Sequence, residues 1–279
     1  MSRGRGGEVL VGADGSDAGT VAVRWAAAEA RQLGWRLRVV VPATSAARGD
    51  ARAVLDATVR QLGDDDLDLV ATVEHGDPGE ILVEAARDAG LAVIGTNRQG
   101  GLLEQQLGVL APWLPQHAGC PTVVVPVREG RDVAGPVRRI VVGVDGSDAA
   151  RTALARAVVE AQAWGARLTA VCGVPMSTPT GVPGWQPASV DREALLAEVE
   201  AGLDRAVKDA TAGRAVDVRR HALDGSGAAL LVEFSTAVDL VVVGARGRGG
   251  FTGLRLGSTS RTLLHHAACP VMLVPARWQ

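Results

Sequence analysis

The stretch RIVVGVDGSDAA (Arg139–Ala150) decides the fold. Its short run of largely β-branched residues, IVVGV, is typical of a fully buried strand. The polar turn that follows leads into an alanine-rich segment with helical spacing. The same pattern occurs earlier in the chain as EVLVGADGSDAG (Glu8–Gly19), where the helical segment stops at Gly34. We therefore expect the chain to begin a strand–turn–helix unit twice.

Further matching blocks follow in the same order in both halves of the chain. WRLRVVVP (Trp35–Pro42) matches ARLTAVCGVP (Ala166–Pro175), and GCPTVVVPVR (Gly119–Arg128) matches ACPVMLVPAR (Ala268–Arg277). A pattern that occurs only twice indicates a tandem duplication rather than a long solenoid. The segment 128–138 is polar, charged and punctuated by glycine and proline, as linkers are. We expect two domains, residues 1–132 and residues 136–279.

Within each half, apolar strands alternate with helical segments. Further helices are predicted over Ala51–Leu62 and Asp191–Ala212, and third strands near Ala71–Glu74 and Val216–His221. This alternation predicts an α/β fold in which each half forms a doubly wound, five-stranded, mostly parallel sheet with helices on both faces. Such sheets bind ligands beyond the carboxyl ends of their strands, where the strand order reverses. The loops after the first and fourth strands are therefore the candidate sites.

The composition excludes several classes of function. The chain has 279 residues, of which 47% are hydrophobic and 22% charged, with a net charge of −2. Near-neutral charge and few aromatic residues do not favour nucleic-acid binding. No apolar run reaches the roughly 20 residues that span a bilayer, so no membrane partner is expected. The three cysteines form no even framework and fit a reducing cytoplasm, and Cys120 and Cys269 are predicted to be buried packing residues.

The loop after the fourth strand of the second half combines three features that suit a polyphosphate. Gly244 and Gly247 can take positive φ angles and let the backbone approach a ligand closely. Gly257 and the hydroxyl run Ser258, Thr259 and Ser260 precede a predicted helix over Arg261–Ala267. A helix N-terminus offers unpaired amide groups and a field that favours anions. The alternative interpretation is a flexible glycine loop followed by an ordinary N-cap.

Other phosphate-binding motifs do not match the spacing. The chain lacks GxxxxGK[ST], and VGVDGSDAA after the first strand is not GxGxxG. Asp145 in this turn could accept hydrogen bonds from a ribose, contact an adenine or hold a magnesium ion. Alternatively, Asp145 and Ser147 only cap the first helix of this half.

These blocks together resemble a tandem universal stress protein. The resemblance rests on IVVGVDGS, on VVVGARGRGG with GS nine residues after the second glycine, and on CPVMLVP. The family's ATP-binding signature is G-2x-G-9x-G-[S/T], and residues 244–258 match it in full. The resemblance covers nearly the whole chain, twice. It implies a Rossmann-like fold of the adenine-nucleotide alpha-hydrolase type.

The resemblance also implies which residues bind ATP, together with Mg²⁺. Val144 and Asp145 would meet the adenosine, and the backbone near Gly173 would face the adenine. The ribose and phosphates would be held by the residues of the signature loop: Val243, Gly244, Arg246, Gly247, Gly257, Ser258, Thr259 and Ser260.

The first half departs from this signature. Gly95 is kept, but Arg98 replaces the second glycine, Glu104 adds a negative charge, and Val109, Leu110 and Ala111 replace the hydroxyl run. Fewer hydroxyls and an added carboxylate both weaken anion binding. We expect nucleotide binding mainly in the second half. Arg98 could fill the phosphate space or bind phosphate itself.

The last strand of each half, PTVVVPV and PVMLVPA, is apolar at successive positions, and a bare apolar edge would aggregate. Family members pair through this strand. We therefore expect the two halves to form an internal pseudo-dimer and chains to form a homo-oligomer through the last strands.

Three functions compete. The leading hypothesis is an ATP-binding regulator of the cytoplasmic stress response. The second is a slow ATPase or a nucleotidyl-transfer enzyme, for which Asp145 is the one candidate group. The third is a nucleotide-free interaction scaffold. The proline- and glycine-rich insertion 176–190 is either a lid in which Trp185 covers the base or a disordered loop.

Overall fold

The computed structural model describes residues 7–43, 48–63, 67–96, 110–128, 130, 133–175, 191–247 and 256–276. Strands and helices alternate through both halves, as the sequence predicts. The first half contains β1 (Glu8–Gly12), α1 (Asp17–Leu33), β2 (Arg36–Ala43), α2 (Arg48–Leu62), β3 (Leu69–His75), α3 (Pro78–Ala85), β4 (Leu91–Thr96), α4 (Leu110–His117) and β5 (Thr122–Pro126). The second contains β6 (Arg139–Gly143), α5 (Asp148–Trp164), β7 (Arg167–Val174), α6 (Arg192–Ala210), β8 (Val218–Asp224), α7 (Gly227–Phe234), β9 (Leu240–Gly244), α8 (Ser258–His266) and β10 (Val271–Val274).

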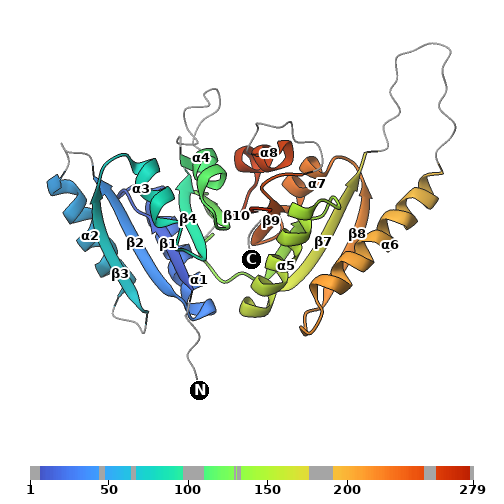
Figure 1. The fold of residues 1–279 in the computed structure, drawn as a ribbon, viewed down its shortest axis with the longest axis horizontal. Helices are drawn as coiled ribbons and strands as arrows, with labels where there is room; N and C mark the ends of the chain where they lie inside the picture. The colour runs from blue at the N-terminus through green and yellow to red at the C-terminus, as the bar shows by residue number, and fades with distance from the viewer. Residues whose placement is uncertain are drawn as a thin grey trace, which may run out of the picture.

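The strands form one continuous sheet in the order β3-β2-β1-β4-β5-β10-β9-β6-β7-β8 (Figure 1). Within each half every neighbouring pair is parallel, which confirms the doubly wound α/β fold. The two expected five-stranded sheets are joined by the antiparallel pair β5 and β10, with Val124 opposite Val271. The halves therefore share one ten-stranded sheet.

This junction bears on the expected partner surface. β5 lies between β4 and β10, and β10 lies between β5 and β9, so each strand has a neighbour on both sides within the chain. The apolar last strands therefore cover each other, as the internal pseudo-dimer requires. The expectation that these strands also join separate chains is wrong, because neither has an unpaired edge left for a second chain to extend.

Two hydrophobic cores lie on opposite faces of the sheet. Helices α1, α2, α5 and α6 contribute to one core, and α3, α4, α7 and α8 contribute to the other. Cys120 and Cys269 are 3% and 0% exposed and belong to the second core, which confirms that they are packing residues.

Helices α1 and α5 begin and end in the same way. Ser16 and Ser147 are their N-caps, and each helix ends at a glycine with a left-handed φ, 64° at Gly34 and 61° at Gly165. This confirms the predicted stop at Gly34. Since the helices occupy equivalent positions, residues of α1 can be compared with the residues of α5 that lie 131 positions later.

Several sequence features lie outside the described residues. They are Arg98, Glu104, Val109, Arg248, Arg255 and the insertion 176–190 with Trp185. Within the described part of the chain, no helix combines the length and the apolar character needed to cross a membrane.

Candidate functional site

A cavity of about 720 Å³ lies at the carboxyl ends of the parallel strands β6, β7 and β9. The strand order reverses between β6 and β9, which is where doubly wound sheets bind ligands. Every residue to which the resemblance assigns a role in nucleotide binding lines this cavity: Val144, Asp145, Gly173, Val243, Gly244, Arg246, Gly247, Gly257, Ser258, Thr259 and Ser260. The fold thus brings together segments that lie up to about a hundred residues apart in the sequence.

The first turn of α8 forms one wall of the cavity. The predicted helix begins at Arg261, but α8 begins at Ser258, so the hydroxyl residues lie inside its first turn rather than before it. Gly257 is the N-cap and makes no side-chain hydrogen bond. The amide groups at this end therefore lack the side-chain acceptor that α1 and α5 have, and they are suited to an anion.

The hydroxyl groups of this turn differ in what they can do. The Ser260 hydroxyl is buried and donates a 2.9 Å hydrogen bond to the carbonyl oxygen of Gly244. This hydrogen bond joins the start of α8 to the end of β9. Ser260 is therefore a residue that positions the first turn of α8. Ser258 is exposed and Thr259 is partly exposed, so these two hydroxyls face the solvent side of the cavity.

The two carboxylate oxygens of Asp145 have different surroundings, one at the start of α5 and the other beside Gly247. Its Oδ1 accepts a 2.9 Å hydrogen bond from the backbone N–H of Ser147, the N-cap of α5. Its Oδ2 lies 2.6 Å from the place where a Cβ would stand on Gly247. Any side chain at position 247 would collide with this carboxylate. One carboxylate oxygen of Asp145 therefore supports the helix cap, and the other borders the cavity.

Gly244 and Gly247 do not use the positive φ angles that glycine can take. Neither residue is among the described glycines with positive φ. A Cβ on Gly244 would lie 2.8 Å from the carbonyl carbon of Ala149 in α5, so glycine is needed here for close packing. The equivalent Gly95 packs against the Ala18 carbonyl of α1 in the same way. This contact explains why the first half keeps Gly95 although it has lost the second signature glycine and the hydroxyl run.

Gly173 is also explained by close packing. A Cβ at this position would lie 2.6 Å from the backbone nitrogen of Gly227, at the start of α7. The absence of a side chain lets the turn before α7 lie against the end of β7. Gly173 therefore leaves bare backbone on the cavity wall beside the place expected for the adenine.

Sequence reasoning missed the apolar wall of the cavity. Val199 of α6, Leu231 of α7 and Leu256 line it together with Val171 of β7. Val199 and Leu231 carry no motif, and only the packing of α6 and α7 brings them to the site. Arg261 also lines the cavity and, with Arg246, places two exposed guanidinium groups beside the start of α8. The combination of an apolar wall, open amides and two arginines suits a flat base joined to an anionic group.

The first half has a different surface at the equivalent positions. Pro42 of β2 stands where β7 has Gly173, and α4 begins with Leu110 and Ala111 where α8 has Thr259 and Ser260. Ala111 is buried and has no hydroxyl that could bond to Gly95. No metal-binding group of three or more histidine, cysteine, aspartate or glutamate side chains occurs among the described residues of either half.

Comparison with known proteins assigns the chain to a family. The sequence model of the universal stress protein family matches residues 7–126 and again residues 136–275. A universal stress protein of Mycolicibacterium smegmatis is 31% identical over 295 residues, which cover 96% of this chain and 97% of that protein. A universal stress protein of Mycobacterium bovis is 34% identical over 198 residues, which cover 70% of this chain and only 65% of that protein's length.

Solved structures show the same fold. The crystal structure of a universal stress protein from Archaeoglobus fulgidus superposes with a TM-score of 0.66 at 16% identity, covering 96% of this chain and 98% of that one. At this identity the likeness concerns the fold alone. The two family matches together take in most of the sequence. The chain therefore belongs to the universal stress protein family and contains the family's domain twice in tandem.

Proposed function

We propose that the second half binds ATP together with Mg²⁺, and that the chain acts as a cytoplasmic regulator of the stress response. One observation carries this proposal. One cavity is lined by the first turn of α8, whose amide groups have no side-chain cap, by Gly247 beside the Asp145 carboxylate, and by an apolar wall. A helix N-terminus without a side-chain cap supports the placement of phosphates, and bare backbone beside apolar side chains supports the placement of a base.

Different residues of the cavity would bind different parts of the nucleotide. The amides at the start of α8 and the hydroxyls of Ser258 and Thr259 would donate hydrogen bonds to phosphate oxygens. Arg246 and Arg261 would balance the negative charge. The carboxylate of Asp145 is exposed and is the one acidic side chain on the cavity wall, so it would hold either the ribose hydroxyls or the magnesium ion.

We propose that the first half does not bind nucleotide in this manner. Its equivalent helix start lacks the hydroxyls, and its sequence has Arg98 in place of Gly247. The duplicated half would then serve mainly to pair with the second half through β5 and β10. Any homo-oligomer would have to form through other surfaces, such as the edge strands β3 and β8.

Binding rather than catalysis is proposed as the function. Asp145 is the one candidate base among the described residues that line the cavity, and no second carboxylate stands beside it there. Slow ATP hydrolysis and a nucleotide-free scaffold are the alternatives. If the chain hydrolyses ATP, Asp145→Asn should abolish turnover, whereas a scaffold would bind no nucleotide at all.

Calorimetric titration of the purified chain, stripped of ligand, with Mg-ATP tests the proposal. We expect one site per chain, and Gly247→Arg should abolish binding because the side chain would collide with Asp145 and fill the phosphate space. Two sites would mean that the first half is also competent. The absence of any binding heat at millimolar ATP would support the scaffold.

The duplication supplies a matched control. Asp14 and Asp145 occupy equivalent turns, and each accepts a hydrogen bond from the backbone N–H of the serine two residues later. Asp145→Asn should weaken ATP binding, whereas Asp14→Asn should leave the affinity and the stoichiometry unchanged. Equal losses in both variants would contradict a site confined to the second half.

A further inference from the structure

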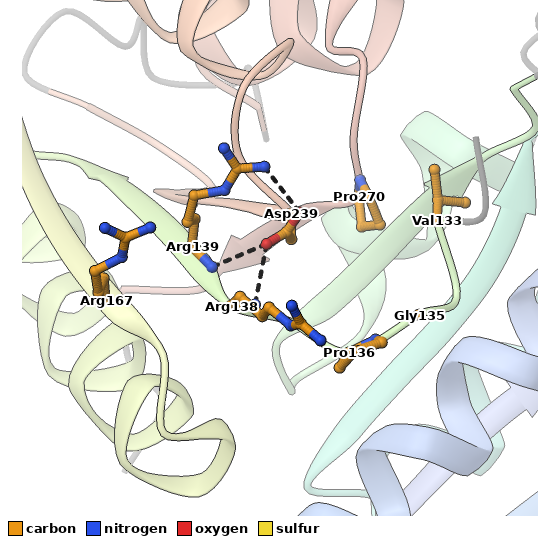
Figure 2. Close-up of a pocket in the computed structure, with 8 residues that line it drawn as sticks. All are labelled: Val133, Gly135, Pro136, Arg138, Arg139, Arg167, Asp239 and Pro270. Atoms are coloured by element: carbon orange, nitrogen blue, oxygen red, sulfur yellow. Dashed lines mark hydrogen bonds and ion pairs between the residues drawn. The ribbon is translucent and has the colours of Figure 1, made fainter. Parts of the chain in front are cut away.

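A second cavity lies at the opposite end of the same half of the sheet. It has a volume of about 470 Å³ and is lined by Arg138, Arg139 and Arg167, by Asp239, and by residues of the connection between β5 and β6 (Figure 2). Arg139 and Arg167 begin β6 and β7, and Asp239 directly precedes β9. These are the amino ends of the parallel strands, so the cavity is separate from the candidate nucleotide site. Its volume is in the range of small-molecule sites.

The charges of this cavity are unbalanced. Asp239 accepts hydrogen bonds of 3.0 and 2.9 Å from the backbone N–H groups of Arg138 and Arg139, and its other oxygen lies 3.7 Å from the Arg139 guanidinium. Among the residues that the structure describes, no carboxylate forms an ion pair with Arg138 or Arg167. The lining therefore carries three guanidinium groups and one carboxylate, which is itself held by backbone donors.

The equivalent edge of the first half differs in both shape and charge. Backbone pairing makes Gly7 and Gly90 the counterparts of Arg138 and Asp239, because Gly7 accepts from Arg36 as Arg138 accepts from Arg167. The indole of Trp35 lies so close to both glycines that a Cβ on either would stand 2.5 Å from it. In the second half Ala166 replaces this tryptophan, and charged side chains replace the glycines.

The arginine at the start of the second strand also has a different environment in each half. In the first half, Arg36 pairs with Asp68 at 3.0 Å. The second half has the same two residue types at Arg167 and Asp217, yet they form no ion pair. Arg167 therefore keeps its guanidinium donors for another acceptor. At this edge of the sheet the second half therefore lacks the tryptophan that fills the space in the first half, and it carries an excess of positive charge that the first half lacks.

We propose that this arginine pocket, formed by Arg138, Arg139, Arg167 and Asp239, binds a small molecule with two or more phosphate groups. Guanidinium forks match phosphate oxygens in geometry and are weakly hydrated for a cation. Figure 2 shows the Arg139 guanidinium turned toward Asp239, the Arg167 side chain on the far side of Arg139, and the Arg138 side chain extended toward Pro136. Cationic groups spread around a rim suit a ligand with several charged groups better than a single point charge.

Titration with inorganic pyrophosphate tests this site without a nucleoside. The chain used carries Gly247→Glu, which blocks the phosphate space of the candidate nucleotide cavity without adding a cation. We expect one pyrophosphate per chain, an affinity at least tenfold weaker for orthophosphate, and weaker binding at high salt, since exposed charges are screened. Adding Arg138→Gln and Arg167→Gln should weaken pyrophosphate binding at least tenfold.

The matched control is Arg36→Gln, which removes the equivalent arginine of the first half and should leave the affinity unchanged. Two results of the pyrophosphate titration would overturn the proposal. One is the absence of pyrophosphate binding at millimolar concentration. The other is binding that disappears with Gly247→Glu alone and survives the double arginine substitution, because the phosphates would then occupy the nucleotide cavity. Citrate binding with equal affinity would show that the pocket selects negative charge and not phosphate, and would also contradict the proposal.

Discussion

Glu29 and Glu160 occupy the same position in the equivalent helices α1 and α5, and both carboxyl groups are buried where the two helices meet. The guanidinium of Arg156 pairs with Glu160 and lies 3.8 Å from Glu29, and the indole N–H of Trp164 donates a 2.7 Å hydrogen bond to Glu29. Arg156 stands where α1 has Trp25. One cation, Arg156, therefore lies beside two carboxyl groups from equivalent positions of the two halves.

Two ionised carboxylates beside one arginine would leave a net negative charge in the interior. Burial raises the pKa of Glu29 well above its ordinary value, and the neighbouring charge of Glu160 raises it further. The raised pKa favours the neutral form of Glu29, while Arg156 and Glu160 form the ion pair. With a proton on Glu29, one cation and one carboxylate would remain at the interface between the halves.

The first prediction concerns pH. A carboxyl with a higher pKa in the folded chain takes up a proton on folding, so its contribution is complete below the unfolded pKa of about 4.3 and is lost as the pH rises through the folded pKa. Within that window the free energy of unfolding should fall by up to about 1.4 kcal/mol per pH unit. Urea denaturation at a series of pH values measures this slope.

Glu29→Gln is the informative variant for this slope, because glutamine still accepts a hydrogen bond from Trp164 but cannot ionise. In this variant the number of protons taken up on folding should fall by about one, so the free energy of unfolding should change less steeply with pH. Glu84→Gln, at an exposed residue paired with Arg87, is the control and should leave the slope unchanged. An unaltered slope in Glu29→Gln would mean that Glu29 is already ionised in the folded chain.

The second prediction concerns Arg156. Arg156→Leu leaves the Glu160 carboxylate buried without a cation, and breaking a buried pair in this way costs about 3–5 kcal/mol. Arg156→Leu with Glu160→Leu should recover most of that loss, since Glu29 is neutral and needs no counterion. Arg151→Leu removes an exposed pair with Asp148 and should change stability by less than about 1 kcal/mol. Equal stability of the single and double Arg156 variants in thermal unfolding would contradict the assigned charges.

The sequence predicted the α/β fold and the duplication, because periodicity and spacing record local structure and its repetition. The resemblance to universal stress proteins implied which residues meet at the cavity. It did not predict why the glycines are needed. The sequence does not show whether a glycine is needed for a positive φ or for close packing. At Gly244 the structure shows the reason, because Ala149 lies too close to leave room for a side chain. The Glu29–Arg156–Glu160 cluster was also unpredictable, since it depends on how two distant helices meet. The apolar wall at Val199 and Leu231 depends on helix packing in the same way.

The third prediction separates packing from binding at the shared glycine. Gly95→Ala should destabilise the chain by roughly 1–3 kcal/mol through overpacking against the Ala18 carbonyl, although the first half is not expected to bind nucleotide. Gly202→Ala is the control, because Gly202 lies inside α6 with its nearest neighbouring atom 3.8 Å from the added Cβ. It should stabilise the chain by about 0.5–1 kcal/mol. Chemical denaturation compares the two, and a harmless Gly95→Ala would remove the packing explanation.

The last prediction uses the cysteines to locate the nucleotide. Burial raises the pKa of the Cys120 thiol to about 12, and Cys269 is fully buried, whereas Cys172 is partly exposed and lines the candidate nucleotide cavity. Since the thiolate is the reactive form, iodoacetamide should modify Cys172 in the folded chain and the other two cysteines only after unfolding. Mg-ATP at about ten times its Kd should slow the modification of Cys172 about tenfold by occupying the site. Peptide mass mapping follows each cysteine separately, and Gly247→Arg should remove the protection. If ATP binds by calorimetry yet leaves the rate at Cys172 unchanged, the nucleotide lies elsewhere on the chain, because a ligand seated against β7 would cover this thiol.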